Sequence, residues 1–363
     1  MSTHKAIVTV AVRAPLEIIE VPTVQPVTRE VRVRVEWTAS TPLDLHQNDG
    51  GLIVKYPQIL GSGVAGTVVE VGPMVRNLAL GDQKVFGFCF EEAKCKAQQE
   101  FVTVLETSLG KLPSGFSLQE AVTLPNNVVT IFHGMTTGLS IPLAWPCSQA
   151  PPPPHANIPV LIWGGTSSCG QYELQILSHW GYKNLLTTAS PANHAYLRSL
   201  GAAHTFDYRD PDVSKQIIEA AEKQVPAIPF VFDCIGSKSG SLAQIAKIAQ
   251  KGTRVAVLLP VVLKDATEED APEYAMDVEP HAPWAEGVDT RGVRTHFYKE
   301  NEFFREYLQP TIVPTLLADG VIKPNKQKIV EGETLLERGQ NALDMLRRKE
   351  VSAERLVWRV SSN

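Results

Sequence analysis

The sequence lacks the features that mark several broad classes of protein. It has no uninterrupted apolar run of the roughly 18 to 20 residues that a transmembrane helix needs, and no basic and then apolar stretch typical of a secretion signal. Its formal net charge of −5 and pI of about 6.0 offer no excess of basic side chains to a phosphate backbone or an acidic lipid surface. We therefore expect a cytoplasmic protein that binds neither nucleic acid nor membrane and acts on small molecules.

Cysteine is also scarce, with five residues in a chain of 363. These are Cys89, Cys95, Cys147, Cys169 and Cys234. They are odd in number and widely spread, unlike a secreted disulfide framework or a set of paired metal ligands. We expect reduced thiols.

The chain is longer than one ordinary core supports, so two domains are expected. In the first third, residues 31–37 alternate valine or tryptophan with charged side chains, which predicts a strand with one wet face. Residues 64–71 predict another strand, and Gly81-Asp82 predicts a turn before residues 84–86. The pattern favours a strand-rich, barrel-like domain.

The pattern changes after four consecutive prolines at 151–154, which predict a loop at the protein surface. Beyond them, short apolar runs alternate with helical stretches, which is typical of a parallel sheet covered on both faces. The expected strands are residues 160–163, 185–188, 230–234 and 255–259, and the expected helices are residues 171–180, 192–200, 213–224 and 241–249.

The last hundred residues are harder to interpret. Residues 261–291 carry acidic clusters and prolines without clear periodicity, which predicts a long loop or lid. A short strand is expected at residues 293–298. Later elements are expected to be a helix ending near Asp319-Gly320, a helix over 335–348 and a strand over 355–360.

A glycine-punctuated turn follows the first strand of the alternating region. Such a turn lets the backbone approach a pyrophosphate closely, and the next helix offers amide donors and its dipole to that anion. The predicted cofactor-binding residues here are Gly164, Gly165, Thr166, Ser167, Ser168 and Gly170. The strict G-x-G-x-x-G spacing is not met, so an ordinary strand-to-helix turn is the alternative.

The residues at the end of the second strand indicate which dinucleotide the protein binds. An acidic residue there would grip the ribose hydroxyls of NAD, but residues 187–190 contain no carboxylate. Ser190, with Asn193, His194 and Arg198 after it, supplies donors and a fixed charge for a 2′-phosphate. We therefore expect NADPH as the cofactor. A role for Ser190 as the cap of a helix beginning at Pro191 is compatible with this.

Several motifs together carry a family resemblance. They are the glycine-rich stretch 61–72, Gly81-Asp82, the glycine turn, Leu200-Gly201-Ala202-Ala203 before 206–208, and residues 317–324. In this order they resemble the quinone-reductase and enoyl-reductase branch of the medium-chain dehydrogenase/reductase superfamily. Ser190-Pro191, residues 206–211 and Asp233-Cys234-Ile235 resemble fungal trans-acting enoyl reductases that serve iterative polyketide synthases.

The resemblance implies an α/β fold in two domains. A GroES-like β-barrel catalytic domain would comprise residues 1–123 and 320–363, and a Rossmann domain with a doubly wound parallel sheet would bind NADP(H) with residues 124–319. Zinc enzymes of this superfamily have Gly-His-Glu where this chain has Gly61-Ser62-Gly63, and a ligand cysteine where it has residues 40–44. No metal is therefore expected.

The resemblance also implies roles for single residues. Thr130 matches a hydroxyl beside the nicotinamide, with helix packing as the alternative. His46 matches a polar or basic cleft residue that donates a proton or a hydrogen bond, with a plain surface histidine as the alternative. Tyr208 matches a tyrosine that borders the adenosine pocket or packs as an aromatic side chain, and Cys234 and Ile235 line the nicotinamide side.

The implied activity is NADPH-dependent reduction of an activated C=C bond in an enoyl thioester, enone or quinone, because donors alone can stabilise the enolate charge that forms. The implied substrate is a small unsaturated molecule carried by the acyl carrier domain of a polyketide synthase, within secondary metabolism. A zinc-free carbonyl reductase or alcohol dehydrogenase and a non-catalytic NADPH-binding protein are the alternatives. The chain is expected to be a monomer or a homodimer.

Overall fold

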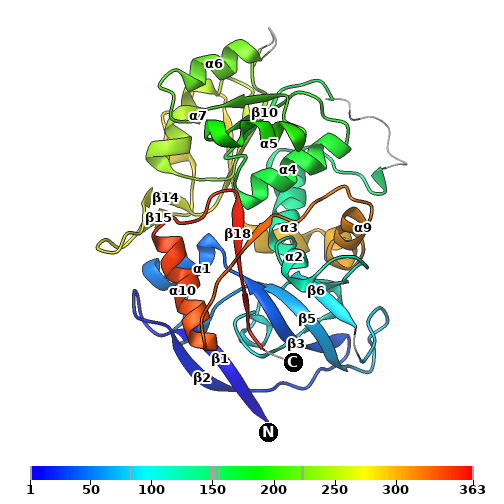
Figure 1. Ribbon diagram of the computed structural model, residues 1–363. Coiled ribbons are helices and arrows are strands. Elements are labelled where there is room, and N and C mark those ends of the chain that lie inside the picture. The colour runs from blue at the N-terminus through cyan, green and yellow to red at the C-terminus, as the bar shows by residue number, and fades with distance from the viewer. Residues whose placement is uncertain (1, 82, 148–152, 154–155, 222–224, 362–363) are drawn as a thin grey trace. The chain divides into compact units, whose positions relative to one another are not determined.

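The computed structural model describes the chain apart from residues 1, 82, 148–152, 154–155, 222–224 and 362–363. The chain forms two compact units (Figure 1). Unit 1 comprises Met1–Asn126, Asp265–Pro272 and Lys299–Asn363, and unit 2 comprises Asn127–Lys264 and Glu273–Tyr298. The expected domain boundary at 123/124 lies three residues from the first of these divisions.

Unit 1 is built around the strand that the period-two pattern predicts. β3 (Glu30–Ala39) buries its valines while Arg32 and Arg34 stay partly exposed, and it pairs antiparallel with β5 (Gly63–Val71) and β7 (Phe101–Leu105). Among the described residues the main sheet has the order β17-β18-β3-β5-β6-β8, and a smaller one has the order β2-β1-β4. The remaining strands are β1 (Thr3–Thr9), β2 (Glu17–Pro22), β4 (Gln58–Ile59), β6 (Lys84–Phe88), β8 (Leu109–Lys111), β17 (Lys326–Ile329) and β18 (Glu354–Arg359).

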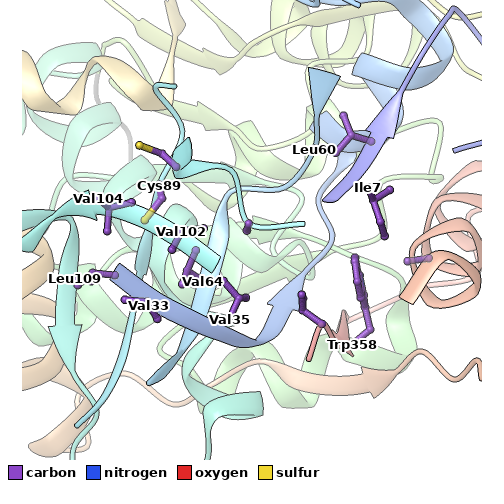
Figure 2. Packing of buried hydrophobic residues seen from close by; sticks show 14 of the residues in the cluster. Ile7, Val33, Val35, Leu60, Val64, Cys89, Val102, Val104, Leu109 and Trp358 are labelled. Atoms are coloured by element: carbon purple, nitrogen blue, oxygen red, sulfur yellow. The ribbon is translucent and has the colours of Figure 1, made fainter. Parts of the chain in front are cut away.

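The core of unit 1 joins distant parts of the chain. Figure 2 shows Ile7 beside Trp358, with valines from the main sheet packed in the same cluster. α10 (Leu335–Arg347) approaches them closely at Gly339, where a Cβ would lie 2.6 Å from Cδ1 of Ile7. The glycine therefore lets the helix cover this part of the core.

The helical stretch before Gly320 belongs to unit 1, whereas the sequence places it in the nucleotide-binding domain. It comprises α8 (Glu302–Tyr307), η9 (Leu308–Ile312) and α9 (Val313–Ala318). A Cβ at Gly110 of β8 would lie 2.5 Å from the Gln309 carbonyl oxygen and 2.5 Å from Cγ of Pro314. This close packing on β8 explains the assignment, because periodicity reveals that a helix has a buried face but not what covers it. The other helices of unit 1 are α1 (Pro42–Gly50), η1 (Ala93–Cys95), η2 (Glu106–Ser108) and α2 (Leu118–Ala121).

Unit 2 contains the expected parallel sheet, with the order β11-β10-β9-β12-β13-β16 over the described residues. Numbered from β9, this is the order 3-2-1-4-5-6 of the Rossmann fold, which confirms the predicted fold class. The strands are β9 (Val160–Trp163), β10 (Leu185–Thr188), β11 (His204–Phe206), β12 (Phe230–Asp233), β13 (Arg254–Leu258) and β16 (Asp289–Val293). The helical elements are α3 (Pro125–His133), η3 (Gly134–Gly138), α4 (Ser168–His179), η5 (Pro191–Asn193), α5 (His194–Ser199), α6 (Val213–Ala220), η6 (Lys238–Leu242), α7 (Ala243–Ile248), η7 (Glu279–His281) and η8 (Thr295–Glu300).

One sequence prediction for this region is wrong, and another describes only part of what the structure shows. The strand expected at residues 293–298 lies earlier, at β16, and η8 follows it. β16 reads Asp-Thr-Arg-Gly-Val and sits at the edge of the sheet, so it carries no apolar run to mark it. The stretch 261–291 is not a plain loop, because β14 (Val261–Lys264) and β15 (Glu273–Ala275) pair antiparallel within it.

Some predictions fall outside the described residues. These are residues 151, 152 and 154 of the proline run, Asp82 of the predicted turn and the end of the helix expected over 213–224. None of the helices in the described ranges combines the length and hydropathy needed to cross a membrane. The cytoplasmic location stays a prediction.

Candidate functional site

The strand order reverses between β9 and β12, and the glycine turn lies there at the carboxyl end of β9. This is where open parallel sheets bind their ligands. Gly164 adopts φ +87°, and α4 begins four residues later with Ser167 as its N-cap, accepting a hydrogen bond from the Gly170 amide at 3.0 Å. The turn therefore presents the start of a 12-residue helix at the ligand-binding edge.

The glycines of the turn serve close packing more than hydrogen bonding to a ligand. A Cβ at Gly165 would lie 2.1 Å from Oγ1 of Thr187, and one at Gly170 would lie 2.5 Å from the carbonyl oxygen of Gly164. The amides of Gly164 and Gly165 already donate to Thr188, at 2.9 Å to its hydroxyl and 3.0 Å to its carbonyl. Any donors for an anion would therefore come from the first turn of α4, where amides lack intrahelical acceptors and the Gly170 amide is already bonded to Ser167.

The end of β10 carries the residues expected around a 2′-phosphate. Ser190 is partly exposed and precedes η5, and its side chain makes no capping hydrogen bond. Asn193 donates its amide to the Ser190 carbonyl oxygen at 2.9 Å. Arg198 is exposed on α5, and its Nη1 donates to the Thr205 hydroxyl at 2.8 Å. These three residues follow β10, which carries no carboxylate.

The neighbouring strand adds a residue that sequence reasoning missed. The Ala189 amide donates to the Phe206 carbonyl oxygen at 2.9 Å, so the segment after β11 lies beside Ser190. There, Tyr208 is 46 % exposed, and the guanidinium of Arg209 lies 5.6 Å from its ring centroid. Arg209 also pairs with Asp207 at 3.0 Å, which lowers the pKa of that carboxyl. In the sequence, the only signal for Arg209 is its position next to Tyr208.

The end of β12 positions Cys234 and Ile235 through a buried carboxyl. Asp233 is fully buried and accepts from the Ser241 hydroxyl at 2.6 Å and from the Ile235 amide at 2.9 Å. Burial raises the pKa of Asp233 to about 6, although these hydrogen bonds oppose the shift. Ile235 is held 46 % exposed beside Gly164, where a Cβ would lie 2.6 Å from Cδ1 of Ile235. The sequence signal for Asp233 is an acid at the end of a buried strand.

The thiol of Cys234 lies beside a buried carboxyl on α4. Its thiol donates to Oε2 of Glu173 at 3.8 Å, and Glu173 is fully buried. Burial raises the pKa of both side chains well above their ordinary values. Cys234 therefore stays a thiol at neutral pH, which suits a role in shape.

Thr130 is buried on α3, and its hydroxyl lies 2.8 Å from the hydroxyl of Thr295, either of which could be the donor. Thr130 therefore belongs to a buried pair of hydrogen-bonded hydroxyls, and its place beside a nicotinamide stays a prediction.

His46 lies on α1 and is partly buried. Desolvation lowers the pKa of its imidazole to about 4, although the carboxylates of Asp265 and Asp49 oppose this shift. The ring is therefore neutral at pH 7. Of the two roles expected for His46, a hydrogen-bond donor fits this state and a charged proton donor does not.

We predict that the Hε1 resonance of His46 stays flat between pH 8 and 5 and moves only near pH 4, measured by NMR against His46→Gln for assignment. Because the folded pKa lies below the unfolded value of 6.5, this histidine contributes stability above pH 6.5 that is lost as the pH falls towards 4. In His46→Gln, the free energy of unfolding should therefore fall less steeply as the pH is lowered from 6.5 to 4. Titration of the resonance near pH 6.5 would contradict the burial argument.

The two segments that carry no zinc ligands meet around Asp44. Its Oδ1 accepts from the Gly61 amide at 3.1 Å, and its Oδ2 accepts from the Thr41 amide at 2.8 Å. Asp44 is 4 % exposed, although in the sequence it looks like one more residue of a turn. Across the part of the chain that the structure describes, no three His, Cys, Asp or Glu side chains come together to hold a metal ion.

Comparison with known proteins agrees with this geometry. Residues 28–133 match the alcohol dehydrogenase GroES-like domain. The trans-enoyl reductase himH of Aspergillus japonicus is 30 % identical over 340 residues, covering 92 % of this chain and 90 % of that protein. The enoyl reductase component lovC of lovastatin nonaketide synthase, from Aspergillus terreus, is 26 % identical over 91 % of this chain and 89 % of its own.

A solved structure supports the same fold. The quinone oxidoreductase from Coxiella burnetii superposes with a TM-score of 0.72 at 20 % identity, over 99 % of this chain and all of that one. The GroES-like match and the Rossmann order of unit 2 agree with it. The chain is therefore an oxidoreductase of the medium-chain dehydrogenase/reductase superfamily and belongs to the branch of the fungal trans-acting enoyl reductases.

Proposed function

We propose that this enzyme reduces the C=C bond of an enoyl thioester with NADPH, acting in trans on a chain held by the acyl carrier domain of a polyketide synthase. The observation that carries the proposal is the glycine turn opening α4 beside a carboxylate-free end of β10. Relatives named trans-enoyl reductases, matched over most of both chains, support the substrate class.

The residues present fit a pyridine dinucleotide. No side chain could fit at Gly165 or Gly170, so the helix start lies close against the strand ends, and its amides are the donors that a pyrophosphate requires. Ser190 and Arg198 would hold the 2′-phosphate, with Arg209 and Tyr208 beside the adenosine. When bound, the cofactor supplies the hydride.

The protein side chains would then stabilise charge on the substrate. Hydride addition to the β-carbon moves an electron pair onto the thioester oxygen, and preorganised donors at that oxygen lower the barrier. The neutral imidazole of His46 in unit 1 and the hydroxyl of Thr130 in unit 2 are separate candidates for this task. Both act as hydrogen-bond donors and neither needs to carry a charge.

A substrate panel tests the reaction. Crotonyl and longer enoyl thioesters, an enone, a quinone and a simple ketone would each be mixed with NADPH, and then with NADH, while the absorbance of the reduced cofactor is followed. Fastest turnover of the enoyl thioesters with NADPH supports the proposal. Preference for the ketone would favour a carbonyl reductase, and tight NADPH binding without turnover would favour a non-catalytic protein.

Arg198→Ala tests the phosphate pocket. Loss of a charge-assisted contact to a phosphate costs about 1.5–3 kcal/mol, so NADPH affinity should fall roughly tenfold or more. NADH lacks the 2′-phosphate and serves as the internal control, and its affinity should barely change. Binding of both nucleotides would be followed by fluorescence titration, and equal losses for the two would refute the assignment.

The partner proposal has its own test. Presenting the same enoyl chain on an acyl carrier domain and on a small thiol separates recognition of the carrier from recognition of the acyl group. A higher kcat/KM for the carrier-bound chain supports action in trans. Whether the enzyme is a monomer or a homodimer stays a prediction for sedimentation analysis.

A further inference from the structure

Unit 2 carries a carboxylate at the ligand-binding edge of its sheet that the proposed function does not use. Asp207 follows β11 directly, and β11 pairs parallel with β10. Thr188 pairs with Phe206, and the Ala189 amide donates to the Phe206 carbonyl oxygen at 2.9 Å. Asp207 therefore lies next to the residues just before Ser190, although β10 itself offers no carboxylate.

A free carboxylate at this edge favours one dinucleotide over the other. It accepts hydrogen bonds from the ribose hydroxyls of NADH, and it repels the 2′-phosphate of NADPH. Hydrogen bonds from Arg209 lower the pKa of Asp207, and the charge of His194 adds to this effect. His194 begins α5, and its Nε2 lies 3.0 Å from the Ala189 carbonyl oxygen. Asp207 is therefore within electrostatic range of the residues predicted to hold the 2′-phosphate.

Arg209 occupies both oxygens of this carboxylate. Its Nε donates to Oδ1 of Asp207 at 3.0 Å, and its Nη2 donates to Oδ2 at 3.1 Å. The Arg209 amide adds a third hydrogen bond to Oδ1 at 3.1 Å. The Asp207 side chain is 27 % exposed and that of Arg209 is 58 % exposed, so the pair presents mainly its guanidinium to solvent.

Tyr208 helps to hold the guanidinium in this position. The guanidinium carbon of Arg209 lies 5.6 Å from the centroid of the Tyr208 ring, a distance at which the ring face attracts a cation. All of these contacts are made within residues 207–209. The arrangement is therefore formed before any ligand binds.

We infer that Arg209 determines the choice of dinucleotide by masking the carboxylate of Asp207. With the guanidinium in place, the carboxylate is not available to the ribose hydroxyls of NADH, and its charge no longer repels a 2′-phosphate. Without the guanidinium, the same carboxylate would favour NADH. The inference rests on the proposed function, because it requires a dinucleotide to bind at this edge of the sheet.

Arg209→Ala tests the masking role through nucleotide binding, measured by isothermal titration without substrate. The Kd for NADPH should rise about tenfold, because the exposed carboxylate repels the phosphate, and the Kd for NADH should fall about threefold, because the ribose gains an acceptor. A weaker affinity for NADPH with an unchanged affinity for NADH would overturn the inference, since Arg209 would then be a direct ligand of the phosphate.

A second substitution removes the unmasked charge. Adding Asp207→Asn to Arg209→Ala should bring the Kd for NADPH back to within about threefold of the wild type and abolish the gain for NADH, because the two residues act as one unit. In roughly 1 M salt the effect of Arg209→Ala alone should shrink, since exposed charges are screened. A double variant that binds NADPH as weakly as Arg209→Ala would overturn the inference.

A matched pair on β16 provides the control. Arg291 binds Asp289 with the same spacing in the chain and the same atoms, at 3.2 Å from Nε to Oδ1 and 3.0 Å from Nη2 to Oδ2. In the sheet order, β16 and β11 lie at opposite ends. Arg291→Ala should change neither Kd by more than about twofold.

Two outcomes separate this inference from the proposed function. Tight binding of NADPH by the wild type, with the same preference in Arg209→Ala, would overturn the inference alone. Failure of the wild type to bind either nucleotide would overturn it together with the proposed function.

Discussion

Gly165→Ala is expected to reduce NADPH affinity about 10- to 100-fold, because the added methyl has no room. Its carbon would lie 2.1 Å from Oγ1 of Thr187, a buried side chain held by a 2.8 Å hydrogen bond to the Ile162 carbonyl, and 3.1 Å from Cδ1 of Leu197. Relief requires the turn to move away from β10, which carries the start of α4 with it. Overpacking of this kind costs about 1–3 kcal/mol, and each 1.4 kcal/mol is about tenfold in affinity.

Isothermal titration with NADPH measures this effect, and Gly138→Ala provides the control. A Cβ at Gly138 would lie 3.0 Å from Cβ of Ala256, so the variant also adds a methyl to a packed site in unit 2. It should lose some thermal stability and keep its NADPH affinity. Unchanged affinity in Gly165→Ala would show that the turn is not the pyrophosphate site.

Arg347→Met is expected to cost about 3–5 kcal/mol of unfolding free energy, because it leaves a buried charge without its partner. The guanidinium of Arg347, at the end of α10, donates to both oxygens of Asp49 at 2.7 and 2.8 Å. The Asp49 side chain is fully buried, on the helix that carries His46. Equilibrium urea unfolding followed by circular dichroism measures the loss.

Two further variants locate the cause of that loss. Adding Asp49→Asn to Arg347→Met removes the unpaired charge and should restore part of the stability. Lys326→Met breaks a pair with Glu354 in which the lysine side chain is 76 % exposed, and should cost about 0–1 kcal/mol. If Lys326→Met and Arg347→Met lost similar amounts of unfolding free energy, burial of Asp49 would not be the cause of the loss in Arg347→Met.

The buried strands were predictable because their signal is local. β9 and β10 occupy the residues expected from their apolar runs, and β3 follows the period-two pattern across its valines. The position of β16 was not predicted, because an edge strand needs no continuous apolar run. The assignment of α8 to unit 1 was not predicted either, because a helix pattern does not identify what packs against its buried face.

The features of the candidate site also fall into two groups, those visible in the sequence and those that depend on the fold. The glycine turn and the missing acid after β10 are visible in the residue types themselves, because each occupies a few consecutive positions. The contacts of Arg209 with Tyr208, and of Asp233 with Ser241, depend on how neighbouring strands and helices meet. The low pKa of His46 also arises from burial that no motif encodes.

The order of the elements, the glycine turn and the family could all be recognised in the amino-acid sequence, because each depends on residue types at short spacings. Which charged groups are buried together depends instead on the tertiary fold. Asp44 and Lys96 come from the first third of the chain and Arg355 from its last strand, yet the charges of Lys96 and Arg355 both lower the pKa of Asp44. Electrostatic interactions act through space, and only the fold sets the distances and the loss of water that determine their strength.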